Sequence, residues 1–191
     1  MPFSSDTFDS VFSAQLLKLN PATVLDVGAG AGKYGRHIKT ILPAAVVDAI
    51  EPTAAYRADY NLADIYATVY DTPLRDYAVK HSKNRHNLVI FGDVLEHFFR
   101  SEATDYIDYF LYRSDWVICV WPTFMPQDDA HDNHYEIHKS NFNLLDLAQK
   151  FDVHFYEKRF GWFHWNIPEF THCEYNYCLI KGYVTPRNTG L

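Results

Sequence analysis

Three alternate glycines that directly follow a short apolar run constrain this chain more than any other feature. Residues 23–27 read Thr-Val-Leu-Asp-Val, and Gly28, Gly30 and Gly32 come next, before a helical pattern over residues 33–42. Such a turn lets the backbone pass close to a ligand, because a Cβ atom there would obstruct the turn or the approach. The amide groups that open the following helix favour electron-rich ligand groups. The sequence therefore predicts a ligand-binding unit of strand, turn and helix.

The alternation of short apolar runs with helical patterns continues along the chain. Strands that alternate with helices imply right-handed crossovers between parallel neighbours. We therefore expect a doubly wound, mainly parallel α/β sheet with an antiparallel C-terminal edge. The strands expected after the glycine turn cover residues 44–50, 65–70, 87–91, 115–121, 151–156 and 175–183.

The length and composition favour one domain, because 191 residues with 48% apolar residues can bury a sizeable core. We expect residues 1–184 to form this domain, with an amphipathic helix within residues 1–20 and a flexible tail at 185–191. The segments 123–140 and 157–172 are expected to be substrate-side loops. The apolar face of the N-terminal helix is expected to carry Phe8, Val11, Phe12, Leu16 and Leu17.

Charge and hydropathy disfavour several classes of partner. A net charge of −7 argues against tight general binding to phosphate backbones, so nucleic acid is not expected as a partner. No apolar run approaches the roughly 20 residues of a membrane helix, and the N-terminus lacks a positive leader with an apolar run behind it. Three cysteines without C-x-x-C spacing indicate neither a disulfide framework nor a Cys-rich zinc site. We expect a cytoplasmic protein without membrane contact.

Two acids near the glycine turn narrow the choice of ligand. Asp26 lies in the first expected strand, two residues before the first glycine, and Glu51 ends the second expected strand. An acid about 20 residues beyond such a turn can accept hydrogen bonds from both ribose hydroxyls of an adenosine-containing ligand. NAD and S-adenosylmethionine share that feature, so both stay open at this point.

Other glycine-turn patterns fit less well. A Walker-type phosphate loop needs four residues between its first Gly and the Gly-Lys pair. Gly28 and Gly32 enclose three, and Tyr34 stands where Ser or Thr would bind magnesium. Gly30, Gly32 and Gly35 do satisfy the pattern G-x-G-x-x-G, so an NAD(P)-dependent oxidoreductase remains an alternative.

A third motif follows the strand expected at 87–91. Residues 87–97 read NLVIFGDVLEH and place a small residue and an acid where open α/β sheets bind ligands. Together with VLDVGAGAGKYG and AIEP, this segment resembles the class I S-adenosylmethionine-dependent methyltransferases, particularly the branch with a D-x-L-E-H segment after the fourth strand. The resemblance covers about residues 20–122, with the three motifs in the right order and spacing. It implies S-adenosylmethionine as the cofactor and S-adenosylhomocysteine as the product.

The resemblance also assigns parts of the cofactor to the ends of the first four strands. The glycine motif would hold the methionine part, the second strand end the ribose, the third the adenine, and the fourth the methionine and the transferring methyl group. In that order, the residues implied are Asp26, Gly28, Gly30 and Gly32, then Glu51, then Asp71 and Thr72, then Gly92 and Asp93.

Histidines supply the candidate catalytic groups. His97 follows the fourth expected strand, beside Glu96, and its imidazole could take a proton from a hydroxyl or amine. The alternative for His97 is to cap or pack the helix that follows. His134 and His138 lie in the segment 126–142, where either could serve as a general base or as a hydrogen-bond anchor for a substrate.

The same segment could instead hold a divalent metal or form a polar surface loop. Its spacing is not a recognised zinc signature, so no metal is predicted, although a cation at 128–138 stays open. Related small-molecule methyltransferases carry an N-x-x-E-x-H-x-S-like stretch here, and Asn133, Glu136, His138 and Ser140 match it. The metal-binding residue types in the segment are His131, His134, His138, Asp128, Asp129, Asp132 and Glu136.

These observations predict a methyltransferase that acts on a hydroxyl or amine of a small molecule. Methyl transfer from a sulfonium depends mainly on alignment of the reacting atoms and on removal of a proton from the acceptor. A DNA amino-methyltransferase is disfavoured because its D/N/S-P-P-aromatic motif is absent, and no cysteine follows a proline as a cytosine-C5 enzyme requires. A cofactor-binding protein of the same fold without transfer activity, as a sensor or partner subunit, is the main alternative.

Overall fold

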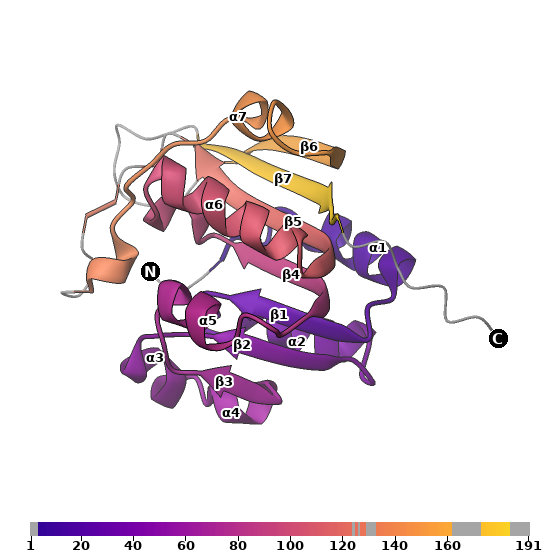
Figure 1. Ribbon diagram of the computed structural model, residues 1–191, viewed down its shortest axis with the longest axis vertical. Coiled ribbons are helices and arrows are strands. Elements are labelled where there is room, and N and C mark those ends of the chain that lie inside the picture. Colours follow the sequence, from indigo (N-terminus) through magenta and orange to yellow (C-terminus); the bar gives the residue numbers. More distant parts are fainter. Residues whose placement is uncertain (1–3, 124, 126, 129–132, 162–172, 184–191) are drawn as a thin grey trace.

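A computed structural model describes residues 4–123, 125, 127–128, 133–161 and 173–183 (Figure 1). The strands within these residues form one mixed, seven-stranded sheet. They are β1 (Thr23–Val27), β2 (Val46–Ile50), β3 (Thr68–Tyr70), β4 (His86–Gly92), β5 (Ser114–Thr123), β6 (Val153–Gly161) and β7 (Cys173–Lys181).

The order of the strands is β3-β2-β1-β4-β5-β7-β6. β1 to β5 pair in parallel, whereas β7 runs antiparallel to both β5 and β6. β2 and β3 thus follow β1 toward one edge of the sheet. The chain then crosses back, and β4 and β5 lie on the other side of β1. This arrangement confirms the predicted doubly wound α/β fold with an antiparallel C-terminal edge.

Helices cover both faces of the sheet (Figure 1). Buried side chains of α1, α2 and α4 pack on one face, and those of α5, α6 and α7 pack on the other. None of the helices described here is long and apolar enough to cross a membrane. Their bounds are α1 (Asp9–Leu19), α2 (Lys33–Ile41), α3 (Ala54–Asp59), α4 (Leu62–Ile65), α5 (Leu74–Lys80), α6 (Arg100–Leu111) and α7 (Leu144–Ala148), with short 3-10 helices η1 (Leu95–His97) and η2 (His134–Glu136).

The central strands are apolar on both faces because helices cover both sides. In β4, Leu88, Val89, Ile90 and Phe91 are fully buried, and successive residues alternate between the two helical layers. A continuous apolar run of this length therefore marks the middle of the sheet, as the sequence indicates for residues 87–91.

The register of the parallel strands brings three chain turns to one edge of the sheet. Val27 at the end of β1 lies opposite Ile50 of β2 and Phe91 of β4. The residues that follow these strands therefore leave the sheet side by side, which is where ligands bind in open α/β sheets. Gly28, Glu51 and the Gly92–Asp93 pair meet at this edge.

Two details of the sequence prediction are wrong. Residues 157–161, expected at the start of a substrate-side loop, belong to β6 because they pair with β7, with Glu157 opposite Tyr177. Leu17, expected on the apolar face of α1, is 63% exposed, since the buried face of that helix follows Phe8, Phe12 and Leu16. Residues 162–172 and the expected tail at 185–191 lie outside the described residues.

The adjacent leucines of α1 give a matched test of this packing. Leu16 is 0% exposed and Leu17 is 63% exposed. We expect Leu16→Ala to lower the free energy of unfolding by about 2–5 kcal/mol, because it removes buried methyl groups and leaves a cavity. Leu17→Ala should change it by less than about 0.5 kcal/mol. Urea unfolding of both variants measures the difference, and equal losses would contradict the orientation of α1.

Candidate functional site

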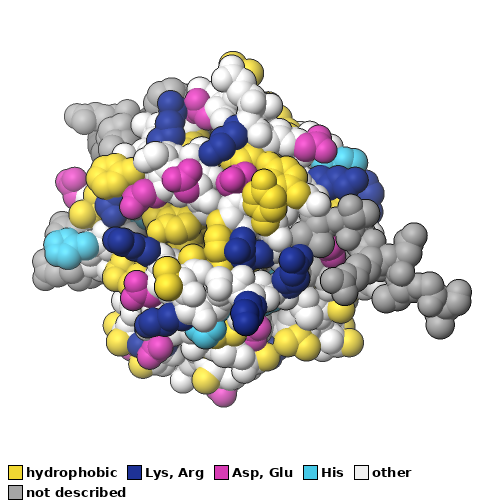
Figure 2. Space-filling view, in the orientation of Figure 1, with side chains coloured by type: hydrophobic (Ala, Val, Ile, Leu, Met, Phe, Trp, Pro, Cys, Tyr) yellow, Lys and Arg dark blue, Asp and Glu magenta, His cyan; other side chains and the backbone are white. Residues whose placement is uncertain are grey.

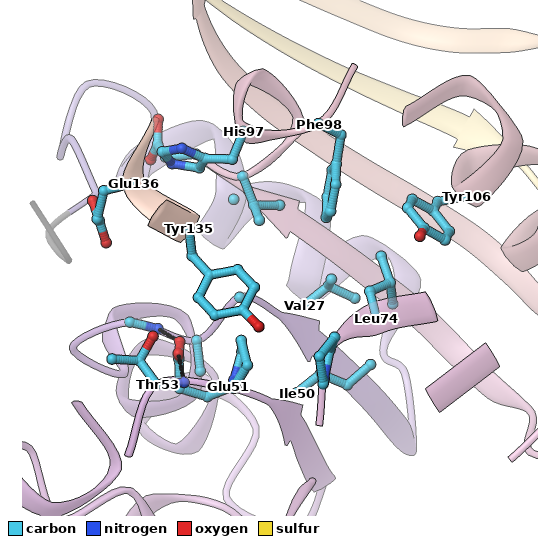
Figure 3. Close-up of a pocket in the computed structure, with 18 of the residues that line it drawn as sticks. Val27, Ile50, Glu51, Thr53, Leu74, His97, Phe98, Tyr106, Tyr135 and Glu136 are labelled. Carbon is cyan, nitrogen blue, oxygen red and sulfur yellow. Dashed lines mark hydrogen bonds between the residues drawn. The ribbon is translucent and has the colours of Figure 1, made fainter. Parts of the chain in front are cut away.

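A cavity of about 260 Å³ opens at the carboxyl edge of the parallel strands (Figure 3). This volume is close to the lower end of the roughly 300–1,000 Å³ typical of small-molecule sites. Its walls come from the ends of β1, β2 and β4, the start of α5, and parts of η1, α6 and η2. Ser4, at the beginning of the described chain, also lines it. Segments far apart in the sequence thus enclose one space.

The glycine turn forms part of the wall with its backbone. Gly28 has a φ of +71°, and a Cβ atom there would lie 2.6 Å from Cγ2 of Val94, so a side chain is excluded on both grounds. The N–H groups of Gly28 and Ala29 donate to the carbonyl oxygen of Ile50 at 2.9 and 3.2 Å, which closes the turn against β2. Gly28 and Gly30, both predicted from the sequence to hold the methionine part of the cofactor, line the cavity.

Of the other two predicted glycines, Gly92 lines the cavity and Gly32 does not. Gly32 precedes α2, packs against Ile65 and Leu62, and does not line the cavity. Gly92 does line it, and a Cβ atom at Gly92 would lie 1.9 Å from the ring of Tyr34, so only a glycine lets α2 pack this closely on β4.

The carboxylate of Glu51 joins the glycine turn to the segment after β2. Its Oε2 accepts a hydrogen bond from the N–H of Gly30 at 2.8 Å, and its Oε1 accepts one from the N–H of Thr53 at 2.8 Å. Glu51 is buried and lines the cavity, and burial raises its pKa above the usual range. The Thr53 side chain also hydrogen-bonds this carboxylate. A carboxylate has about four acceptor sites, so the group can still accept a hydrogen bond from a ligand hydroxyl.

Asp26 lies behind the cavity wall. The hydroxyl of Tyr66 donates to its Oδ2 at 2.5 Å, and the N–H of Gly35 donates to the Tyr66 oxygen at 3.3 Å. Burial raises the pKa of Asp26 to about 7, although the Tyr66 hydrogen bond acts in the opposite direction. Asp26 is thus connected through Tyr66 to α2. Sequence reasoning missed Tyr66, which has no motif of its own.

Asp93 follows β4 in a left-handed conformation, with a φ of +54°. Its carboxylate oxygens are buried and lie close to the Ser4 side chain and the Ser5 backbone. Burial raises the pKa of Asp93 to about 7, against the opposing influence of the nearby Ser4 hydroxyl and Lys33 ammonium. Asp93 lines the cavity at the position that the sequence predicted.

The structure does not bring the predicted adenine contacts to the wall. Asp71 is exposed, Thr72 is half-buried, and neither lines the cavity. Pro73 and Leu74, the next residues along the chain, line it instead. The helix α5 begins at Leu74, so its first turn presents an apolar side chain to the cavity rather than an acid.

Two of the three candidate catalytic histidines lie together. His97 lines the cavity, and its ring contacts that of His138 at a centroid distance of 4.8 Å in an edge-to-face arrangement. Burial, with His138 adding to the effect, lowers the pKa of His97 to about 4, so its imidazole is neutral at pH 7. His134 is exposed and does not line the cavity, and His131 lies outside the described residues.

The segment around η2 closes the side of the cavity opposite the glycine turn. Tyr135 points into the cavity (Figure 3). Glu136 is buried, and its Oε1 accepts a hydrogen bond from the hydroxyl of Tyr56 at 2.9 Å. Tyr56 follows the Glu51 turn on α3, so this contact connects the histidine-rich segment to the glycine-turn side. The sequence pointed to this segment but not to Tyr135 or Tyr56.

Comparison with known proteins gives structural neighbours alone. No protein-family model and no curated protein matches the sequence. Among solved structures, TehB from Haemophilus influenzae has a TM-score of 0.66 at 12% identity, covering 93% of this chain and 66% of its own. The magnesium protoporphyrin IX methyltransferase ChlM from Synechocystis PCC 6803, solved with bound SAM, has a TM-score of 0.59 at 15% identity, covering 93% and 79%.

A third neighbour is the N-terminal domain of EvdMO1 with SAH bound, which has a TM-score of 0.66 at 10% identity over 94% of this chain and 82% of its own. The chain spans 55% of the length of a Nostoc punctiforme protein with the same fold. The fold is that of the class I S-adenosylmethionine-dependent methyltransferases.

The raised pKa of Asp26 predicts how stability depends on pH. The folded protein keeps a proton on Asp26 up to about pH 7, whereas the unfolded chain releases it near pH 4, so the folded state loses stability as the pH rises between these values. Asn cannot titrate. We therefore expect the free energy of unfolding of Asp26→Asn, relative to wild type, to rise by about 2–4 kcal/mol over this interval and then level off.

Urea unfolding at several pH values measures this trend. Asp59→Asn, at an exposed position on α3, is the matched control and should show no such rise. A difference between Asp26→Asn and wild type that stays constant from pH 4 to pH 7 would contradict the prediction.

Proposed function

We propose that this protein is an S-adenosylmethionine-dependent methyltransferase that acts on a hydroxyl or amine of a small molecule. One observation carries the proposal: a single cavity joins Gly28, Gly30, Glu51 and Asp93 on its cofactor side to His97 on the side of η1 and η2. That arrangement provides the two requirements of the reaction, a site for the methyl donor and a neighbouring group that can handle the acceptor's proton.

The cofactor would lie along the ends of β1, β2 and β4. The Glu51 carboxylate, which lines the cavity, suits a ribose hydroxyl as a hydrogen-bond acceptor. Gly28 and Gly30 line the same wall without side chains and suit close approach of the methionine part. Gly92 and Asp93 would then face the methyl group. Structures of this fold contain SAM or SAH, which supports the assignment.

The acceptor would lie between η1 and η2. The neighbouring walls carry the aromatic rings of Phe98, Tyr106 and Tyr135, which suit a small, partly apolar molecule (Figure 3). We propose His97 as the catalytic residue there, because its neutral imidazole lies on the wall and offers a lone pair to a hydroxyl or amine. His138 contacts His97 and acts as a positioning residue. His134 has no such contact with the cavity.

Surface charge is consistent with a small acceptor rather than nucleic acid. On the face shown in Figure 2, Lys and Arg side chains are interspersed with Asp and Glu side chains and hydrophobic groups. No continuous basic strip crosses this face within the part of the chain that the structure describes. Proteins that follow a phosphate backbone place their cations along such a strip.

Substitution of the ribose-binding acid tests the cofactor site. Glu51→Gln keeps the shape of the side chain but removes its charge and one acceptor atom, and hydrogen bonds to a charged group contribute about 1.5–3 kcal/mol. We expect the dissociation constant for S-adenosylhomocysteine to rise about 10- to 100-fold, measured by isothermal titration calorimetry. Asp71 lies outside the cavity wall, so Asp71→Asn should raise this dissociation constant less than Glu51→Gln does. Unchanged affinity in Glu51→Gln would contradict this placement.

Turnover tests the reaction itself. The purified protein, supplied with S-adenosylmethionine and a panel of small hydroxyl and amine compounds, should form S-adenosylhomocysteine only when an acceptor is present. We expect His97→Asn to lower turnover by about 10²- to 10⁴-fold and to change the affinity for S-adenosylhomocysteine little, because the residue lies on the acceptor side. His154→Gln, an exposed histidine on β6, is the control and should keep wild-type turnover.

The same assays separate the alternatives. Binding of S-adenosylhomocysteine without turnover of any acceptor would favour a cofactor-binding protein without transfer activity. Binding of NAD or NADP in place of the sulfur nucleosides would assign the glycine turn to an oxidoreductase and overturn the proposal.

A further inference from the structure

Glu96, His97 and His138 form a cluster beside the cavity, and among the described residues it is the group of histidine and acidic side chains placed to hold a cation. One ligand atom of each residue lies within 4.8 Å of those of the other two. Glu96 and His97 belong to η1, whereas His138 follows η2. The carbonyl oxygen of Glu96 accepts hydrogen bonds from the N–H groups of Lys139 and Ser140, at 2.7 and 3.2 Å. Backbone contacts therefore fix the two segments beside each other.

The two imidazoles are oriented by backbone carbonyls. Nδ1 of His97 lies 3.3 Å from the carbonyl oxygen of Ile137, and Nδ1 of His138 bonds the carbonyl oxygen of Met125. A carbonyl oxygen can only accept, so each Nδ1 carries the proton and each Nε2 carries a lone pair. Histidines that bind metal ions commonly have this arrangement, with one nitrogen donating to a carbonyl and the other bound to the metal.

The third side chain of the cluster, Glu96, is a buried carboxylate with too few hydrogen-bond donors around it. The residue is 2% exposed, and its Oε2 has no hydrogen-bond partner among the described residues. A buried carboxylate oxygen without a partner is costly unless a cation or donor compensates it. The buried carboxylate of Asp93 increases that cost, because it acts on Glu96 as a charge of the same sign. The cluster thus has an excess of negative and lone-pair groups.

We propose that Glu96, His97 and His138 bind a divalent transition-metal ion such as Zn²⁺ or Mn²⁺, with the open coordination positions of the ion toward the cavity. Two imidazoles and one carboxylate suit such ions better than Mg²⁺ or Ca²⁺, which prefer oxygen ligands. Three protein ligands with an open position are typical of catalytic zinc sites.

The spacing of the three ligand atoms allows one cation to reach all of them. A triangle with sides of 4.8 Å has its centre about 2.8 Å from each corner, compared with about 2.0–2.2 Å for zinc bonds to nitrogen and carboxylate oxygen. Each ligand atom would therefore have to move inward by less than about 1 Å to bind one zinc ion.

The role of the metal ion in catalysis rests on the proposed function. If the ion binds there, it narrows the proposed acceptors from hydroxyls and amines to hydroxyls. A hydroxyl oxygen bound to a divalent ion releases its proton to water more readily, because the ion stabilises the resulting alkoxide or phenoxide. That oxygen then forms the O–CH₃ bond while the S–CH₃ bond of S-adenosylmethionine breaks and its electron pair stays on sulfur. With the ion present, the Nε2 lone pair of His97 holds the metal, and the acceptor's oxygen contacts the metal instead of the imidazole.

The test measures metal binding by the full chain in the absence of cofactor. Protein treated with EDTA and then desalted is titrated with Zn²⁺, Mn²⁺ and Mg²⁺ in separate calorimetric experiments. We expect one Zn²⁺ or Mn²⁺ per chain, with Mg²⁺ weaker. Glu96→Gln and His138→Gln should each weaken binding by at least about tenfold. His154→Gln, which removes an exposed histidine elsewhere, should bind as wild type does.

Circular dichroism shows whether each variant is folded, and Glu96→Gln keeps the size and shape of the buried side chain. The absence of saturable binding of all three ions by the wild type would overturn the metal site, and so would wild-type affinity in both Glu96→Gln and His138→Gln. Titration with S-adenosylhomocysteine in EDTA keeps the two proposals separate. Cofactor binding without metal binding overturns the metal site alone, whereas metal binding without cofactor binding overturns the proposed function.

Discussion

The two hydrogen bonds of the Glu51 carboxylate determine the shape of the site more than any other interaction. They hold the glycine turn at Gly30 and the segment after β2 at Thr53, and these are two walls of the same cavity. The parallel register brings the strand ends to one edge, and the bonds from Gly28 and Ala29 to the carbonyl oxygen of Ile50 hold the start of the glycine turn there. The Glu51 carboxylate extends this connection to Gly30 and Thr53. A carboxylate that is buried to join backbone amides also remains available to a ligand.

The fold and the part of the cavity wall formed by the strand ends could be predicted because both depend on local sequence. The alternation of strands and helices predicts the doubly wound sheet, and the turns at Gly28, Glu51 and Gly92 fall at the edge where such a sheet binds ligands. Where another group packs closely against the backbone, only glycine fits, so such positions can be recognised in the sequence. The position of Asp71 was harder to predict, because α5 begins at Leu74 and it is Leu74, not Asp71, that lines the cavity.

The side of the cavity formed by η1 and η2 depends on contacts between residues far apart in the sequence, which no local sequence pattern indicates. His97 and His138 are 41 positions apart in the sequence, and their rings meet because the carbonyl oxygen of Glu96 binds the backbone after η2. Tyr66 and Tyr56 likewise reach Asp26 and Glu136 from distant segments. The exposure of Leu17 and the extension of β6 through residue 161 follow from the neighbouring elements, not from the residues themselves.

The hydrogen bond between Tyr56 and Glu136 has a thermodynamic consequence. It connects the helix after the Glu51 turn to the segment around η2, and the side-chain amide of Asn133 also donates to the Tyr56 hydroxyl, so the two sides of the cavity are linked. A molecule that shifts one half therefore changes the free energy with which the other half binds its own ligand. Linkage makes this coupling reciprocal: whatever affinity a ligand on one side gains from a ligand bound on the other side, the second ligand gains from the first.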